Sequence, residues 1–473
     1  MATSIIQSPA YATMPIGQDV IFTLRNNIIV SNEIKVKFVA NVYISINPIN
    51  IANSTPTGTF KITPNNAGVG IFDFRPILES FVNSDNLGGN GSKYKGTPTS
   101  FGSGTGVHPV HITDKYSRNQ FAVRYMAIEF STQYLNTAVT PNVTINVDPI
   151  NSSQFLIYNG YLTHSDPLTY NTPNIGFPGN NFSYGFDNSL FTTGTSNSKF
   201  LTNASTTQYA TINDYGTVGI LNTANLSYIS VSLYDDTGSQ LGSSIVVEAT
   251  GFSGFNNGAF FGWNSNGSEQ LFYFGFYPAN LRNWSSAFQG FLPNISYYTV
   301  TAFDLNDDVI TKTYRVNILC PNLKGFKPIR LGWLNQWGAW DYYTFNMKST
   351  RTIQTKGTTY QQQSKNWNAP LYRIDSFKGG KKTLRVNATE KIKMNTDFVS
   401  EEESAWFEEL INSPEVYIIE GYQNDALNSA LNNYVIPVRL TTSSFTEKTI
   451  ANDKVMQYTF EVEKTKTLRT QSV

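Results

Sequence analysis

Residues Arg330–Thr350 read Arg-Leu-Gly-Trp-Leu-Asn-Gln-Trp-Gly-Ala-Trp-Asp-Tyr-Tyr-Thr-Phe-Asn-Met-Lys-Ser-Thr, the densest aromatic cluster of the chain. Asn335 to Gly338 has the composition of a turn that reverses the chain, and Asp341 to Phe345 has strand propensity. Aromatic side chains carry the largest apolar area per residue, so such a cluster anchors either a core or an interface. Both readings stay open for the six aromatic residues Trp333, Trp337, Trp340, Tyr342, Tyr343 and Phe345.

The composition around this stretch is that of a β-rich structural protein with many loops. Only 14% of the 473 residues are charged, against about 25% in an average soluble protein. Aromatic residues also make up 14%, which argues against disorder, because disordered chains lack them. The net charge is zero, so the chain as a whole shows no affinity for nucleic acid or an anionic membrane.

Three further features indicate a protein that is made and kept soluble inside a cell. The single cysteine, Cys320, excludes an internal disulfide, which suits a reducing compartment, and it is expected to be a small buried residue. The N-terminus has neither a basic head nor an apolar run of signal-peptide length. No window approaches about 18 consecutive apolar residues, so no membrane span is predicted.

Charge density divides the chain near Cys320. Residues 1–320 hold 14 basic and 18 acidic residues, whereas 321–473 hold 20 and 16. A chain of this length exceeds one core, so three domains are expected at 1–150, 151–320 and 321–473. The predicted class is mainly β: Ig-like β-sandwich domains followed by a mixed α+β domain.

The first two domains show β periodicity. Apolar residues alternate with mostly polar ones from Ile34 to Ile46, which predicts a half-buried strand. Pro76 begins a predicted short helix, and residues 85–111 form a long Gly/Ser/Thr-rich loop. Ser227–Gly238 reads as a strand that enters a turn, and Ser296–Asp304 is similar, but the similarity is too weak to define a repeat.

The last domain combines a helix with antiparallel strands. Ser400 and Glu403 form a capping box at the start of a helix that Pro414 ends. Strands are then predicted over 415–420, 434–441 and 454–463.

No pattern in the chain indicates catalysis, a cofactor or a metal. His108 and His111 offer two ligands in a loop, short of the four that structural zinc requires. Gly88–Lys93 lacks the Gly-Lys-Ser/Thr ending of a phosphate loop. The acidic pairs at 235–236 and 307–308 lie at predicted turns, where Asp is favoured. The protein is therefore expected not to be an enzyme.

The one sharp basic cluster is Lys378-Gly379-Gly380-Lys381-Lys382. It predicts a solvated hairpin, with an electrostatic contact to an acidic neighbouring subunit as the alternative. Lys381 and Lys382 therefore join the six aromatic residues as interface candidates.

Three phrases resemble virion structural proteins of tailed phages that infect Bacteroidota. They are the Leu-Asn-x-x-Gly turn with Asp-Tyr-x-x-Phe at 334–345, Phe-Asp-x-x-x-Ile-Leu at 72–78, and Ser-Pro-Glu-Val-Tyr at 413–417. The resemblance implies a particle component, most readily of the tail or tail tip, assembled in the host cytoplasm. It implies self-association in a ring or spoke and contacts with other virion proteins. The alternative function is a receptor- or glycan-binding tail protein, with a host surface glycan as its partner.

Overall fold

The computed structural model describes residues 2–46, 48–82, 84, 116–118, 122–138, 142–171, 182–191, 194–221, 226–248, 271–319, 325–364, 370–371, 376–420, 435–442, 444, 456–466 and 468–469. The chain is mainly β, with 49% of residues in strands and 13% in helices, which confirms the expected class. It separates into two compact units. Unit 1 comprises Met1–Leu319, Leu334–Asp341 and Tyr422–Leu431, and unit 2 comprises Cys320–Trp333, Tyr342–Gly421 and Asn432–Val473.

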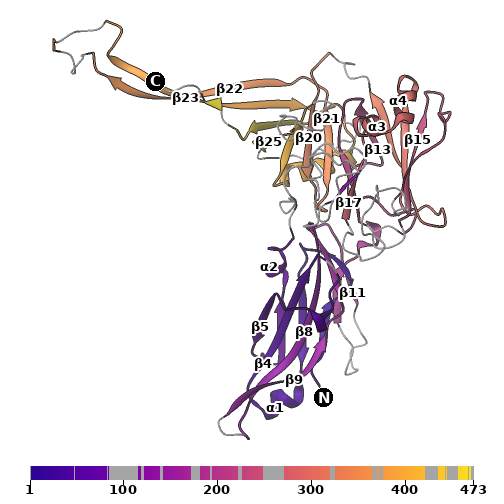
Figure 1. The fold of residues 1–473 in the computed structure, drawn as a ribbon, viewed down its shortest axis with the longest axis vertical. Helices are drawn as coiled ribbons and strands as arrows, with labels where there is room; N and C mark the ends of the chain where they lie inside the picture. Colours follow the sequence, from indigo (N-terminus) through magenta and orange to yellow (C-terminus); the bar gives the residue numbers. More distant parts are fainter. Residues whose placement is uncertain are drawn as a thin grey trace. The chain divides into compact units, whose positions relative to one another are not determined.

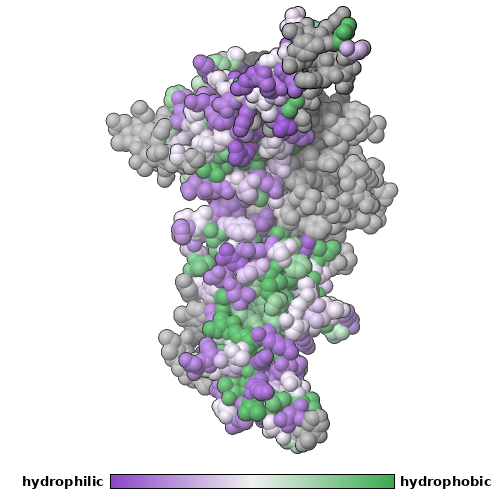
Figure 2. Space-filling view, turned by 90° about the vertical axis from the view of Figure 1, so that its left-hand side faces the viewer, coloured by the Kyte–Doolittle hydropathy of each residue, from purple (hydrophilic) through white to green (hydrophobic). Residues whose placement is uncertain are grey.

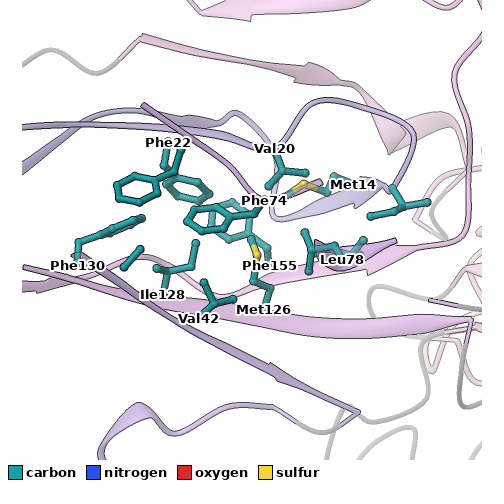
Figure 3. Packing of buried hydrophobic residues seen from close by; sticks show 14 of the residues in the cluster. Met14, Val20, Phe22, Val42, Phe74, Leu78, Met126, Ile128, Phe130 and Phe155 are labelled. Carbon is teal, nitrogen blue, oxygen red and sulfur yellow. The ribbon is translucent and has the colours of Figure 1, made fainter. Parts of the chain in front are cut away.

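Two sheets of unit 1 enclose one core. The first has the order β11-β12-β1-β3-β6, and the second β2-β10-β8-β4-β5 with β9 paired to β8. Phe22 from the first sheet packs against Phe130 and Phe155 from the second, with ring centroids 5.4 and 5.7 Å apart (Figure 3). The strands are β1 Ser4–Pro9, β2 Thr13–Pro15, β3 Ile21–Arg25, β4 Ile34–Ser45, β5 Gly58–Ile62, β6 Val69–Asp73, β8 Val123–Asn136, β9 Val143–Asn151, β10 Phe155–Tyr158, β11 Leu168–Asn171 and β12 Phe182–Phe186.

The expected break at residue 150 does not coincide with a change of sheet. β10 pairs with both β2 and β8, and β12 pairs in parallel with β1. Strands β10, β11 and β12 therefore complete the two N-terminal sheets, and after Thr207 the strands belong to other sheets, one of which also takes in a strand at 116–118. The physical reason is that strand pairing connects segments more than 170 residues apart in sequence, which local composition does not report.

The expected strand over 34–46 is β4, and Phe38, Ala40 and Val42 of its predicted apolar face enter the core. The alternation is incomplete, because Ile34 is 53% exposed and Val39 on the opposite face is buried. The expected short helix at Pro76 is α2 Arg75–Leu78. The loop expected over 85–111 lies outside the described residues. The other short helical segments of this region are α1 Asn27–Asn32, η1 Ile51–Asn53 and η3 Asn188–Leu190.

Two more sheets complete unit 1, with orders β13-β19-β18-β15-β16 and β14-β17-β7. The turns after β15 and β18 have the same geometry: Asp235 and Asp304 each accept two backbone N–H groups, from residues two and four positions later. The similarity noticed in the sequence is thus a shared turn. The elements are β7 Tyr116–Arg118, β13 Thr207–Thr211, β14 Thr217–Leu221, β15 Tyr228–Tyr234, β16 Ile245–Glu248, β17 Leu271–Gly275, α3 Pro278–Trp284, α4 Ser286–Phe291, η4 Leu292–Asn294, β18 Tyr297–Phe303 and β19 Tyr314–Leu319.

Unit 2 is built on an eight-stranded sheet of order β21-β20-β24-β25-β26-β23-β22, with β27 paired to β23. Helix α5 Glu401–Asn412 begins with the expected capping box, in which Ser400 and Glu403 satisfy each other's backbone N–H. Phe407 of α5 packs on Phe460 of the sheet, with ring centroids 5.5 Å apart. The strands are β20 Ile329–Leu334, β21 Trp340–Phe345, β22 Thr350–Gln362, β23 Gly380–Asn395, β24 Val416–Ile419, β25 Val435–Leu440, β26 Thr459–Lys464 and β27 Leu468–Arg469.

Candidate assembly interface

The aromatic stretch that begins at Trp333 is largely core in unit 2. Trp333 is fully buried, and its ring lies 4.8 Å from that of Trp406 on α5. Tyr343 packs edge-on against Phe407 at 4.9 Å, and burial raises the pKa of its hydroxyl. Phe345 is also fully buried and packs against Phe460, with ring centroids 5.7 Å apart. These contacts explain how α5 is held on the sheet.

Tyr342 faces a different neighbour. It is buried, and the Arg330 guanidinium carbon lies 5.3 Å from the centre of its ring. Arg330 also donates to the Thr344 hydroxyl at 2.8 Å. The charge of Arg330 is therefore held between an aromatic face and a hydroxyl, inside the unit.

The tip of the β20–β21 hairpin belongs to unit 1. Trp337 is 2% exposed and lies between Phe186 and Phe191, with ring centroids 5.3 and 4.3 Å away. Its indole Nε1 donates to Asn203 at 3.1 Å. Trp340 is 1% exposed. The tryptophans of the tip are therefore core residues of unit 1.

Asn335 fixes the shape of this tip. Its side-chain oxygen accepts the N–H groups of Trp337 and Ala339 at 3.0 and 2.9 Å, and its Nδ2 donates to the Leu201 carbonyl at 2.8 Å. Gly338 has a φ of +75°, and a Cβ there would collide with the Asn159 carbonyl. The predicted turn is thus present, and only glycine fits at its end.

For the six aromatic residues, the structure supports the core reading that the sequence left open. Five of them are buried and the sixth, Tyr343, is half-buried against α5. None offers a free aromatic face of the kind that an interface anchor requires, because each packs inside the chain.

The two lysine candidates lie elsewhere, on a two-stranded ribbon formed by β22 and β23. The strands pair from Thr350↔Lys393 to Gln362↔Gly380, which corresponds to about 40 Å of strand. β26 and β27 pair with β23 only at Asn387–Ala388 and Lys391–Asn395. Within the described part of the chain, Gly380–Val386 therefore pairs with β22 alone, and this end of the ribbon extends away from the sheet (Figure 1).

The ribbon is exposed on both faces. Residues Thr350–Thr359 of β22 are all exposed, although side chains on a strand alternate between its two faces. Lys381 is exposed and Lys382 is half-buried, with its Nζ donating to the Phe377 carbonyl at 2.7 Å. Leu371 and Phe377, near the far end, are 78% and 73% exposed. The space-filling view shows hydrophilic and hydrophobic residues interspersed over the face that it presents (Figure 2).

A buried carboxylate anchors the base of the ribbon. Glu390 accepts two hydrogen bonds from Arg351, at 2.7 and 2.9 Å, and one from Lys464 at 2.9 Å. The hydrogen bond from Arg351 is the largest cause that holds the Glu390 pKa below its ordinary value. Glu390 therefore links β22, β23 and β26 at one point, and Lys391 adds an ion pair from β23 to Glu461 on β26 at 3.5 Å.

The structure describes only some of the residues that were weighed as catalytic or metal candidates. Asp235 holds its turn by accepting the N–H groups of Thr237 and Ser239, and the hydrogen bonds, first that from the Thr237 hydroxyl, lower its pKa. His108, His111, Gly88–Lys93 and Cys320 lie outside the described residues. Among the residues that are described, no three His, Cys, Asp or Glu side chains come together as a metal site, and no helix is long and apolar enough to span a bilayer.

The sequence predicted a solvated hairpin at Lys378–Lys382 but not the length of the ribbon to which these residues belong. β22 reads Thr-Arg-Thr-Ile-Gln-Thr-Lys-Gly-Thr-Thr-Tyr-Gln-Gln, which lacks the apolar alternation of a half-buried strand. The only sequence signal was its high content of β-branched threonine, followed some residues later by the Gly-Gly pair, both of which have positive φ.

Comparisons with known proteins give no family for this chain. No protein family matches it, and no curated protein is similar to it. Two solved structures that match in part are the native and the trypsin-activated alpha-2-macroglobulin of Escherichia coli, each 8% identical. The TM-scores are 0.18 and 0.17, with 83% and 84% of this chain covered. The chain spans 22% and 26% of the length of those two proteins.

Proposed function

We propose that this protein is a structural component of a tailed phage virion, in the tail or tail tip, that acts by assembling with itself and with other virion proteins. The observation that carries the proposal is the β22–β23 ribbon. It extends past the strands that pair with it and exposes both of its faces. Two-stranded ribbons are marginally stable in water, so a long one gains stability from a partner outside its own chain.

The sequence phrases at 72–78, 334–345 and 413–417 support the same function by their resemblance to phage virion proteins. We also propose the finer fold that this resemblance implies: Ig-like sandwiches in unit 1 and a mixed α+β domain in unit 2. The shared core of the two N-terminal sheets and the packing of α5 on its sheet are consistent with it. Such a component is located in the virion and is assembled in the host cytoplasm.

The proposed role is non-enzymatic. The acidic pairs that a glycosidase would require are placed at turns, where Asp235 is engaged with backbone N–H groups. Purified protein should therefore release no reducing ends from host polysaccharide, and measurable release would contradict this part of the proposal.

The test is to shorten the ribbon without touching the sheet. Residues 358–384 are replaced by a four-residue turn, which keeps the Glu390 anchor and every pair to β26 and β27. The variant should melt at the temperature of the original chain but fail to enter particles, as judged by quantitative mass spectrometry of purified virions. Absence of the unmodified chain from purified virions would refute the function, and normal incorporation of the shortened chain would refute the role of the ribbon.

One observation favours the alternative, a glycan-binding tail protein. Tyr209 on β13 is 56% exposed, next to Asn317 in the paired strand β19. An open tyrosine ring can stack on a sugar, and the Asn317 amide beside it is held by Arg315 at 2.9 Å and by the Gln208 carbonyl at 3.5 Å. The Tyr297 ring is less able to stack on a sugar, because the Arg315 guanidinium carbon lies 3.6 Å from its centre. Tyr234 also stacks against it, with ring centroids 4.9 Å apart. Binding on a host-glycan array that the change Tyr209→Ala removes would favour this function.

A further inference from the structure

The free end of the ribbon carries a strong excess of positive charge. Among the described residues between Thr355 and Thr389 there are five basic residues and no acidic residue: Lys356, Lys378, Lys381, Lys382 and Arg385. Among the described residues, Lys356, Lys381 and Arg385 have no ion-pair partner, and all three are exposed. Within the part of the chain that the structure describes, these three side chains therefore present positive charge without an acidic partner.

Unit 2 also carries the complementary surface, on helix α5. The helix contains five glutamates and no lysine or arginine. Its outer face is formed by Glu401, Ala405, Glu408 and Asn412, which recur at helical spacing, with Glu402 beside them. Within the described part of the chain, Glu401, Glu402 and Glu408 have no ion-pair partner either.

Each surface includes exposed apolar residues as well. Phe377 and Leu371 lie near the far end of the ribbon, and Phe398, which is 64% exposed, lies three residues before the first residue of α5. Apolar contacts supply most of the energy of an interface, while the surrounding charges set partner choice and register.

We propose that the ribbon of one copy of this chain docks on the α5 face of the next copy. Each chain carries both surfaces. Docking in one direction repeats head-to-tail and closes into a ring or extends as a filament, whereas reciprocal docking of two copies gives a twofold dimer. The inference rests on the proposed assembly function and names its partner, a second copy. A nucleic acid would satisfy the basic ribbon but would leave the acidic face of α5 and the apolar residue beside it without a role.

Exchanging the charges of the two surfaces tests this proposal in purified full-length protein. The ribbon variant carries Lys381→Glu, Lys382→Glu and Arg385→Glu, and the helix variant carries Glu401→Lys, Glu402→Lys and Glu408→Lys. Each variant alone should associate at least about tenfold more weakly than the original chain, because like charges then face each other. An equimolar mixture should recover association, because each ribbon then meets a helix of opposite charge.

Mass photometry and sedimentation velocity at low and high salt measure the association, and circular dichroism with thermal melting shows that each variant folds. The matched control is Lys35→Glu with Lys37→Glu, two exposed lysines of β4 in unit 1, which should associate like the original chain. Unchanged association of either variant, or no recovery in the mixture, would overturn the proposal. So would an original chain that stays monomeric at high concentration, or one that binds duplex DNA through these lysines instead.

The outcome is separable from that of the proposed function. If the chain is present in virions but the charge exchange gives a negative result, the proposed function stands and the docking of a second copy is refuted. A chain that passes the charge exchange but is absent from virions self-associates in some other assembly.

Discussion

Replacing Trp337 by alanine should destabilise unit 1 without affecting the ribbon. The side chain is 2% exposed and packs against Phe186 and Phe191. A buried tryptophan removes about 150–250 Å² from water, which at about 25 cal/mol per Å² corresponds to roughly 4–6 kcal/mol. Measured losses for Trp→Ala in cores are about 3–5 kcal/mol, and we expect a loss of unfolding free energy in this range.

Urea titration followed by near-ultraviolet circular dichroism measures the loss, together with the melting temperature. The two units need not unfold together, so the transition of unit 1 is followed separately by hydrogen exchange at β12 and η3, next to the ring. Trp337→Phe is the conservative variant, because it keeps an aromatic ring between Phe186 and Phe191 but removes the hydrogen bond to Asn203. It should lose less unfolding free energy than Trp337→Ala.

Phe398→Ala is the matched control, since this aromatic side chain is 64% exposed and should change stability by less than about 0.5 kcal/mol. An unchanged unfolding transition in Trp337→Ala would refute the core placement and would return Trp337 to the set of interface residues.

Three further outcomes are expected. Gly338→Ala should lower the melting temperature, because the positive φ and the nearby Asn159 carbonyl both exclude a Cβ, at a cost above about 1 kcal/mol. Ser400→Ala should cost about 1 kcal/mol and should be seen as faster hydrogen exchange in the first turn of α5, whereas Ser400→Asp should retain the cap. The Glu390 pKa is lowered, so its ionised form stabilises unit 2 above its ordinary pKa, and that contribution is lost as the pH falls through the lowered value. Thermal melts between about pH 6 and 3 should therefore show a weaker acid dependence in Glu390→Gln, and an identical dependence would contradict the assigned ion pairs.

Features with a local physical cause were predictable from the sequence. The partial alternation in β4 follows from the face that enters the core, and the start of α5 follows from the reciprocal bonds of Ser400 and Glu403. The turn at Asn335–Gly338 was also predictable, because its composition is that of a turn. In each case the residues that decide the structure are neighbours in the chain.

Features that depend on distant pairing were not predictable. The parallel pair of β1 and β12 joins Gln7 to Phe182, and no local pattern at either strand identifies the other. The tip of the hairpin was likewise placed in the last domain, although Asn335 bonds to Leu201 and Trp337 to Asn203, both within unit 1. The length of the ribbon escaped prediction for the opposite reason: a strand exposed on both faces has no periodicity to detect.

The aromatic and the basic candidates therefore do different physical work. The aromatic residues around Trp337 are buried inside the chain, so changes there act on folding, and any loss of assembly follows from the loss of structure. Lys381 is exposed, and Lys382 makes one hydrogen bond within the ribbon, to the Phe377 carbonyl, so we expect changes at these lysines to act on association rather than on folding. A variant of the first kind that melts normally, or a variant of the second kind that unfolds, would show that this separation of folding from assembly is wrong.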